Sequence, residues 1–172
     1  MIEKLSSKQA ATMHKTKNDI AVDQREKLVD LLQQNLFDLI NLQLQTKQAH
    51  WNVKGPHFIG LHELFDAVAE AVEPLVDEVA ERAVSLGGLV DGTVEGIRKN
   101  TTLKPYPTDI VDGRDHVEAL STAIAAAGKK AREAIDEADE LGDKDTADLF
   151  TEVSRVLDKK LWFVEAHLQG GA

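Results

Sequence analysis

Apolar residues recur every three or four positions along four long stretches of this chain. That spacing places them on one face of an α-helix, so each stretch predicts an amphipathic helix with one buried side. Four such helices bury their apolar faces against one another, which predicts an all-α four-helix bundle. The first three expected helices cover about residues 23–51, 58–86 and 112–140, and the fourth carries the stripe Phe150, Val153, Leu157, Leu161, Val164 and Leu168.

The expected helix ends and connections fit a bundle with one long crossover. Asp23 and Glu26 have the spacing of a capping box at the start of the first helix, and the glycine pair at 87–88 ends the second. About twenty residues then separate the second helix from the third, which is long for a compact bundle. Within this connection, residues 91–100 predict one short helix, and the PYP sequence at 105–107 predicts a rigid stop. The expected fold resembles a ferritin-like four-helix bundle with a short extra helix between helices two and three.

Composition restricts the class of protein and the kinds of site that it can hold. The chain has 172 residues, of which 42% are hydrophobic and 29% charged, values ordinary for one soluble globular domain. It has no cysteine, which excludes disulfides, thiolate zinc sites and iron–sulfur clusters. The first residues contain no apolar run typical of a signal peptide, and no segment has the length and apolarity of a membrane helix. We therefore expect a cytoplasmic protein with no membrane partner.

One face of the second expected helix carries four side chains of metal-binding types. His62 and Asp66 are four residues apart, as are Asp77 and Glu81, so each pair lies on one side of the helix. The four side chains share a sector of roughly 100° around the axis, but Asp66 and Asp77 lie roughly 16 Å apart along it, too far to share a metal. The point halfway between residues 62 and 81 along the helix is also halfway between residues 66 and 77. Two antiparallel copies of this helix about a twofold axis would therefore bring each His/Asp pair to the Asp/Glu pair of the other copy.

This pattern predicts a metal site between two chains. One histidine and three carboxylates form an oxygen-rich site, which suits iron better than structural zinc. Glu63, Glu70 and Glu73 occupy the same sector, so angular position alone does not select the ligands. Any one of Asp66, Asp77 or Glu81, taken alone, is typical of a solvated surface charge. Pro74 stands between the two pairs, where it removes a helical hydrogen bond and favours a kink. The chain contains no E-x-x-H sequence, the ligand motif that full ferritins place within one subunit.

Three motifs in and beyond this helix are distinctive. They are HWNVKGPHFIGLHELFD at residues 50–66, the D-x-x-x-E at 77–81 that runs on into ERAVSLGG, and LDKKLWFVEAHL near the end. Together they resemble the signature of the Dps family, the dodecameric mini-ferritins. The resemblance implies a Dps domain over residues 23–168, after a flexible arm of residues 1–22 and before a tail of residues 169–172. It also implies that the short extra helix lies at a dimer interface.

The resemblance further implies a ferroxidase site between two subunits. Its ligands match His50, His62 and Asp66 from one subunit and Asp77 and Glu81 from the other. Apart from His50, these are the two half-sites that the twofold argument gives. The site would hold two iron ions, with zinc as a substitute. Such a protein oxidises Fe(II), with hydrogen peroxide as the preferred oxidant, stores the ferric mineral inside a hollow dodecamer and protects DNA from oxidative damage.

Other residues are assigned less sharply by the resemblance. Trp51 would pack near the iron, although a tryptophan in such a position is more often part of the core. His57, His116 and His167 match no ligand and are expected to be structural or at the surface, with iron uptake or another metal as an alternative for His167. Glu118 is the only acid within residues 116–130, so the acidic entry pore of some Dps proteins is not predicted here.

Two alternative functions remain open from the sequence. One is a DNA-compacting, nucleoid-associated protein in which metal binding is secondary. Its arm would contact DNA through Lys4, Lys8, Lys15 and Lys17, with avidity from many copies. An ordinary solvated tail accounts for the same lysines, and the net charge of −10 predicts weak DNA binding. The other alternative is a bundle whose dimer site holds zinc or serves only as a structural clamp.

Overall fold

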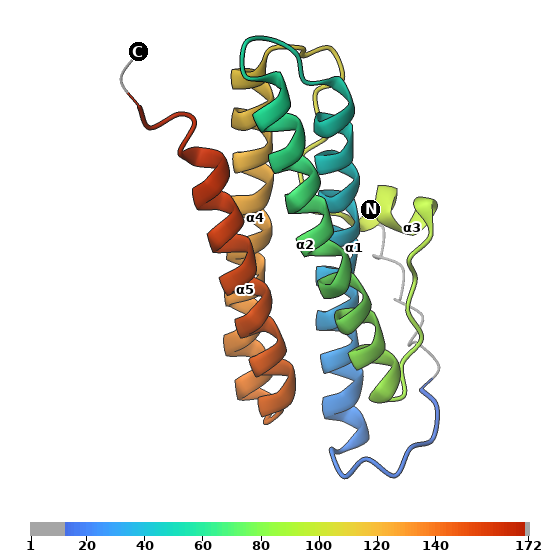
Figure 1. Ribbon diagram of the computed structural model, residues 1–172. Helices are drawn as coiled ribbons and strands as arrows, with labels where there is room; N and C mark the ends of the chain where they lie inside the picture. Colours follow the sequence, from blue (N-terminus) through green and yellow to red (C-terminus); the bar gives the residue numbers. More distant parts are fainter. Residues whose placement is uncertain (1–12, 171–172) are drawn as a thin grey trace, which may run out of the picture.

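The computed structural model describes residues 13–170, which form four long helices, one short helix and the segments that connect them. Figure 1 shows the four long helices as a bundle, with the short helix α3 outside it beside α1. The all-α prediction is confirmed, including the short helix between the second and third long helices. No helix within residues 13–170 combines the length and apolarity needed to cross a bilayer. The bounds are α1 (Val22–Asn52), α2 (Phe58–Ser85), α3 (Val94–Asn100), α4 (Gly113–Glu140) and α5 (Lys144–Glu165).

The long helices pack as two hairpins around one apolar core. Helix α1 lies along α2 and α4 lies along α5, while α1 also contacts α4 and α2 contacts α5 (Figure 1). The stripe expected on the fourth long helix faces this core, where Phe150, Val153, Leu157 and Val164 are buried. Fully burying a leucine or phenylalanine side chain contributes about 1.5–3 kcal/mol, far more than intrinsic helix propensity. Tertiary packing therefore holds α5 in place.

The start of α1 differs from its prediction. The capping box predicted from Asp23 and Glu26 is wrong, because α1 begins at Val22, its N-cap is Ala21, and no side chain caps it. Asp23 instead lies within the first helical turn, where its negative charge favours the positive end of the helix.

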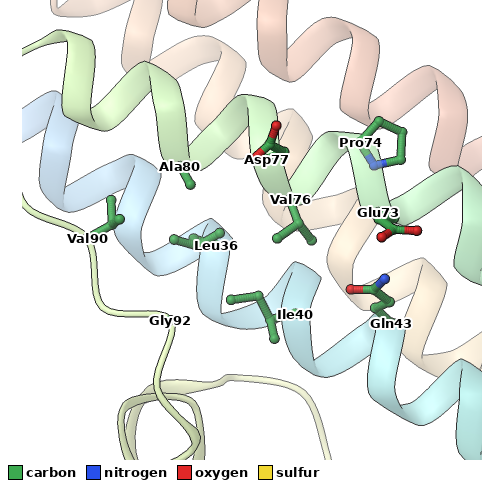
Figure 2. Close-up of a pocket in the computed structure, with 10 residues that line it drawn as sticks. All are labelled: Leu36, Ile40, Gln43, Glu73, Pro74, Val76, Asp77, Ala80, Val90 and Gly92. Carbon is green, nitrogen blue, oxygen red and sulfur yellow. The ribbon is translucent and has the colours of Figure 1, made fainter.

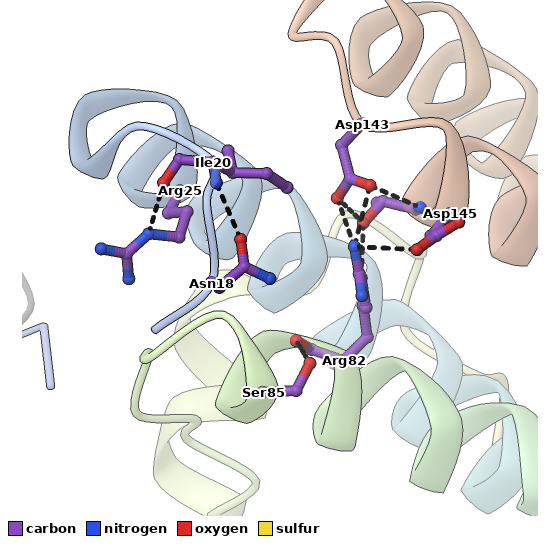
Figure 3. Close-up of polar contacts among 8 residues, drawn as sticks. Asn18, Ile20, Arg25, Arg82, Ser85, Asp143 and Asp145 are labelled. Carbon is purple, nitrogen blue, oxygen red and sulfur yellow. Dashed lines mark hydrogen bonds and ion pairs between the residues drawn. The ribbon is translucent and has the colours of Figure 1, made fainter. Parts of the chain in front are cut away.

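Residues 13–21 lie against the end of α2. The backbone N–H of His14 donates to the Gly87 carbonyl oxygen at 2.7 Å. Gly87 has a φ of 95°, and a Cβ there would come within 2.7 Å of the His14 carbonyl oxygen, so this approach requires glycine. Arg25, only 8% exposed, donates to the carbonyl oxygens of Ile20 at 3.0 Å (Figure 3) and of Leu86 at 2.7 Å. Within the described residues, Met13 and His14 thus already contact the bundle, before residue 23, where the domain is expected to start.

An ion pair joins the end of α2 to the start of α5 (Figure 3). Arg82 Nη2 donates to both carboxylate oxygens of Asp143 at 2.8 Å, and Arg82 Nε donates to the Thr146 hydroxyl at 3.0 Å. Asp143 is only 3% exposed. Burial alone would raise the pKa of Asp143, but hydrogen bonds from Arg82 and Thr146 outweigh burial and hold that pKa below its ordinary value. The charged pair therefore ties together one end of the two hairpins.

The long connection after α3 is held against α1 by the buried Asp38. Its carboxylate accepts hydrogen bonds from the Thr101 hydroxyl at 2.8 Å, the Thr102 N–H at 2.6 Å and the Thr102 hydroxyl at 2.7 Å. Farther along α1, the Gln45 amide donates to the Lys104 carbonyl oxygen at 3.0 Å. Side chains of α1 thus satisfy backbone groups that have no helical partner, so the connection follows a fixed path to α4.

Candidate metal centre

Two histidines face each other across the loop that joins α1 to α2. His50 lies in the last turn of α1, and His62 lies near the start of α2. The chain reverses between them in a turn at Gly55, whose φ of 111° favours glycine. The Phe58 N–H closes this turn by donating to the Gly55 carbonyl oxygen at 3.1 Å. The two imidazole rings consequently stack, with their centroids 3.7 Å apart and their planes inclined by 20°.

Reciprocal hydrogen bonds fix the orientation of both rings. His50 Nδ1 lies 2.7 Å from the His62 carbonyl oxygen, and His62 Nδ1 lies 2.8 Å from the His50 carbonyl oxygen. A carbonyl oxygen can only accept a hydrogen bond, so each Nδ1 carries the hydrogen. In the neutral imidazole the other ring nitrogen, Nε2, then keeps its lone pair. Metal-binding histidines are commonly oriented in this way by a carbonyl on the second nitrogen, so the pair offers two Nε2 donors to a metal.

Asp66 adds a carboxylate one helical turn after His62. Its Oδ1 lies 4.0 Å from His50 Nε2 and 2.5 Å from Lys47 Nζ. The hydrogen bond from Lys47 is the main reason that the pKa of Asp66 lies below its ordinary value, and charge interactions with His50 and His62 act in the same direction. Asp66 is therefore anionic beside the two ring nitrogens, as a carboxylate ligand must be. Sequence reasoning missed Lys47, although its place three residues before His50 puts both on one side of α1.

Asp77 and Glu81 lie farther along α2, and both are exposed. Helix α2 remains one helix through Pro74. The eleven residues from Asp66 to Asp77 therefore span roughly 16 Å at a rise of about 1.5 Å each. Asp77 and Pro74 help to line a hollow of about 670 Å³, with Ile40 of α1 on its wall. Figure 2 shows these residues on α1 and α2. The acidic pair thus lies on an open surface, away from the histidines.

One chain brings only part of the predicted ligand set together. His50 and His62 are in direct contact and Asp66 lies beside them, whereas Asp77 and Glu81 stand apart on the same helix. Within residues 13–170, no three or more His, Asp or Glu side chains form a group that could hold a metal ion. The full ligand set therefore stays a prediction that requires a second chain.

Apolar side chains beside the histidine pair are exposed in the single chain. Trp51 is 64% exposed, Ile59 62% and Phe58 42%. The Phe58 ring also lies 5.1 Å from the His62 ring, between centroids. Trp51, which directly follows His50, is therefore not part of the core of a single chain. Large apolar side chains exposed near a polar site, as Phe58 is beside His62, are typical of a surface that another protein covers.

Three further histidines lie away from this site. His57 precedes the first residue of α2 and is exposed. His116 is buried, and its Nδ1 lies 2.6 Å from the Tyr106 hydroxyl oxygen, within hydrogen-bond distance. Burial lowers the pKa of His116 and raises that of Tyr106, so both side chains are neutral. His167 is exposed, and its Nδ1 lies 3.0 Å from the Phe163 carbonyl oxygen. These positions agree with structural or surface roles.

The lysines considered for DNA contact are divided between two parts of the chain. Lys15 and Lys17 are exposed, whereas Lys4 and Lys8 lie outside the described residues. Lys15 and Lys17 stand in the segment that contacts the bundle through His14 at one end and Arg25 at the other. Their side chains therefore project from a segment that is fixed at both ends.

Comparisons with known proteins agree with this architecture. The ferritin-like domain family matches residues 29–171. The DNA protection during starvation protein of Agrobacterium fabrum is 47% identical over 156 residues, which cover 91% of this chain and 96% of that protein. A Dps structure from Mycobacterium smegmatis is similar with a TM-score of 0.86 at 35% identity, covering 91% of this chain and 95% of its own.

A more distant relative places these proteins in a wider group. The Dps structure from Vibrio cholerae O1 is similar with a TM-score of 0.85 at 26% identity, covering 92% of this chain and 99% of its own. That protein is a member of a broad superfamily of ferritin-like diiron-carboxylate proteins. The motifs, the helical architecture and these similarities give one result: the chain belongs to the ferritin-like family, as a member of its Dps branch.

Proposed function

We propose that this chain oxidises Fe(II), its substrate, at a site shared by two subunits and stores the ferric product inside a hollow dodecamer. The observation that carries the proposal is the His50–His62 pair, because both Nδ1 atoms are bound to backbone carbonyls, which leaves Nε2 of each ring as the nitrogen that a metal could bind. Two imidazole rings locked in this way beside an anionic Asp66 form half of a metal site.

The other half would come from Asp77 and Glu81 of a second copy. Both side chains are exposed on α2, and their distance from Asp66 along the helix is too large for one metal to span within a chain. An antiparallel, twofold-related copy of α2 would bring them to His62 and Asp66. The combined set of two ring nitrogens and three carboxylates offsets the charge of iron and suits two iron ions per site, with zinc as a substitute.

The proposed reaction removes one electron from each of two Fe(II) ions. One molecule of hydrogen peroxide takes up both electrons and two protons and gives two molecules of water. Peroxide is the proposed oxidant because the chain is a Dps protein. Fe(II) and peroxide together generate hydroxyl radicals, so consuming both in the cytoplasm would protect DNA, the role for which the Agrobacterium fabrum relative is named.

Stoichiometry tests this proposal directly. Anaerobic protein loaded with Fe(II) should consume one peroxide per two Fe(II), with no hydroxyl radical trapped, and should react more slowly with dioxygen. Native mass should correspond to twelve chains of 18.9 kDa, about 227 kDa. The His62→Ala variant should lose this reaction, while the matched control His57→Ala, in the exposed turn, should keep it. Equal activity of the two variants would count against the proposed site.

A further inference from the structure

The Asp66 oxygen that faces His50 is already bound by a positively charged side chain. Lys47 Nζ lies 2.5 Å from Asp66 Oδ1, and this same oxygen is the one that lies 4.0 Å from His50 Nε2. Lys47 stands one turn before His50 on α1, so the two side chains leave the helix on the same side. The ammonium group therefore lies where a metal bound to His50 would meet Asp66.

The contact involves this carboxylate in particular. Across the described part of the chain, Lys47 has no second carboxylate within 4.0 Å. The Lys47 and Asp66 side chains are 32% and 38% exposed, so water reaches the pair but does not surround it. Ion pairs with this exposure contribute little to the stability of a fold. The Lys47–Asp66 ion pair is therefore of interest for its position beside the expected ligand His50, and not for its contribution to the stability of the fold.

We propose that Lys47 is the counter-ion of the empty metal site and that an entering metal must displace it from Asp66. The inference rests on the proposed function, because it assigns a role at the same site. Without metal, Asp66 would meet Asp77 and Glu81 of a second copy, and these like charges would repel one another. Lys47 reduces that repulsion. When a divalent cation enters, it competes with the ammonium for Oδ1 and repels it, so Lys47 lowers metal affinity while it stabilises the metal-free assembly.

Metal binding without oxidation provides the first test. Lys47→Gln removes the charge and keeps a side chain of similar reach, whereas Lys47→Arg keeps the charge. We expect anaerobic titration of the assembled protein with Co(II), followed by its visible absorption, to show about tenfold tighter binding to Lys47→Gln, or about 1.4 kcal/mol. Lys47→Arg should bind close to the wild-type affinity. Lys27→Gln, at an exposed lysine on the same helix, is the matched control and should leave the affinity unchanged.

Thermal unfolding provides a second test, which distinguishes the proposed role of Lys47 from a purely structural one. The metal-free Lys47→Gln assembly should unfold at a lower temperature than the wild type. Addition of Co(II) should raise its midpoint by more than it raises that of the wild type, because the metal replaces the missing charge and binds more tightly. A lysine that only supports the fold would lower both midpoints by the same amount.

The outcomes distinguish the role of Lys47 from the proposed function itself. If wild type and His62→Ala bind Co(II) equally, the proposed metal site and its function both fail. If His62→Ala abolishes binding but Lys47→Gln and a second variant, Lys47→Met, bind no more tightly than wild type, the site stands and the role of Lys47 is overturned. A Lys47 variant that assembles only with Co(II) supports the role. Failure of both variants to assemble even with Co(II) overturns it, because the metal-loaded site does not need the ammonium.

Discussion

Mixing two inactive variants should restore part of the activity if the metal site is shared between chains. The first variant carries His62→Ala and Asp66→Ala, and the second carries Asp77→Ala and Glu81→Ala. The two pairs are separated by roughly 16 Å on one helix, so neither variant alone can build a complete site in any pairing with itself. In a mixed dimer, one site draws all four intact residues and the other site lacks all four.

The size of the recovery follows from this geometry. Random pairing of equal amounts makes about half of the dimers mixed, and each mixed dimer has one intact site of two, so activity should reach about a quarter of the wild-type value. The assay is the initial rate of Fe(II) oxidation after co-refolding, with native mass spectrometry of isotope-labelled chains to verify mixing. A double variant in Glu63 and Glu70, which are exposed on α2 but are not proposed ligands, should keep wild-type activity. Activity that stays at the level of the separate variants, despite verified mixing, would falsify the shared site.

Contacts away from the site and the net charge predict further outcomes. Asp143→Ala removes both an ion pair and a helix cap, so it should lower the free energy of unfolding by about 3 kcal/mol. Chemical denaturation measures this change, and the control Asp145→Ala, at an exposed position, should cost about 0.5 kcal/mol or less. The pKa of Asp143 is lower in the folded protein than in the unfolded chain, so the ionised carboxylate stabilises the fold. This stabilisation should be complete at a pH above the unfolded pKa of about 3.9 and should be lost as the pH falls through the lower pKa of the folded protein. The melting temperature, followed during acid titration, measures the loss. Tyr106→Phe leaves the buried His116 Nδ1 without its hydrogen-bond partner and should lower the free energy of unfolding by about 1–3 kcal/mol in the same denaturation assay. Duplex DNA should be retained weakly and released as salt rises, and deletion of residues 1–22 should reduce the remaining gel shift, whereas salt-resistant retention would contradict this expectation.

The long helices were predictable because local and tertiary signals agree in them. Residues 58–86 were expected to form the second helix, and α2 spans Phe58–Ser85. Its apolar residues repeat with helical spacing, and the glycine pair at 87–88 stops it, with Gly87 in the left-handed region that favours glycine. The spacing of His62, Asp66, Asp77 and Glu81 in the sequence is therefore enough to predict that they lie on one helix.

Other features depend on contacts that spacing does not reveal. The helix-start signal at Asp23 and Glu26 predicted the wrong cap, and it gave no sign that Arg25, between them, binds the carbonyl oxygen of Leu86, a residue far along the chain. The same limit applies to the site. Lys47 matters only because the turn after α1 brings α2 alongside and places Asp66 within its reach. Spacing within one helix identifies a shared face, but it does not identify the group that faces it from another helix.

The contact between His50 and His62 bridges a separation of only twelve positions. Closing so short a loop costs little chain entropy, and helices adjacent in sequence find each other quickly, so this hairpin is well suited to form early in folding, even on the ribosome. The proposed acidic half-site, by contrast, awaits an encounter with a second molecule, whose rate depends on concentration. A newly made, solitary chain would then have its ring nitrogens in place but would leave Fe(II) unoxidised. Ferric product would begin to form only once the enclosure that holds it is being assembled.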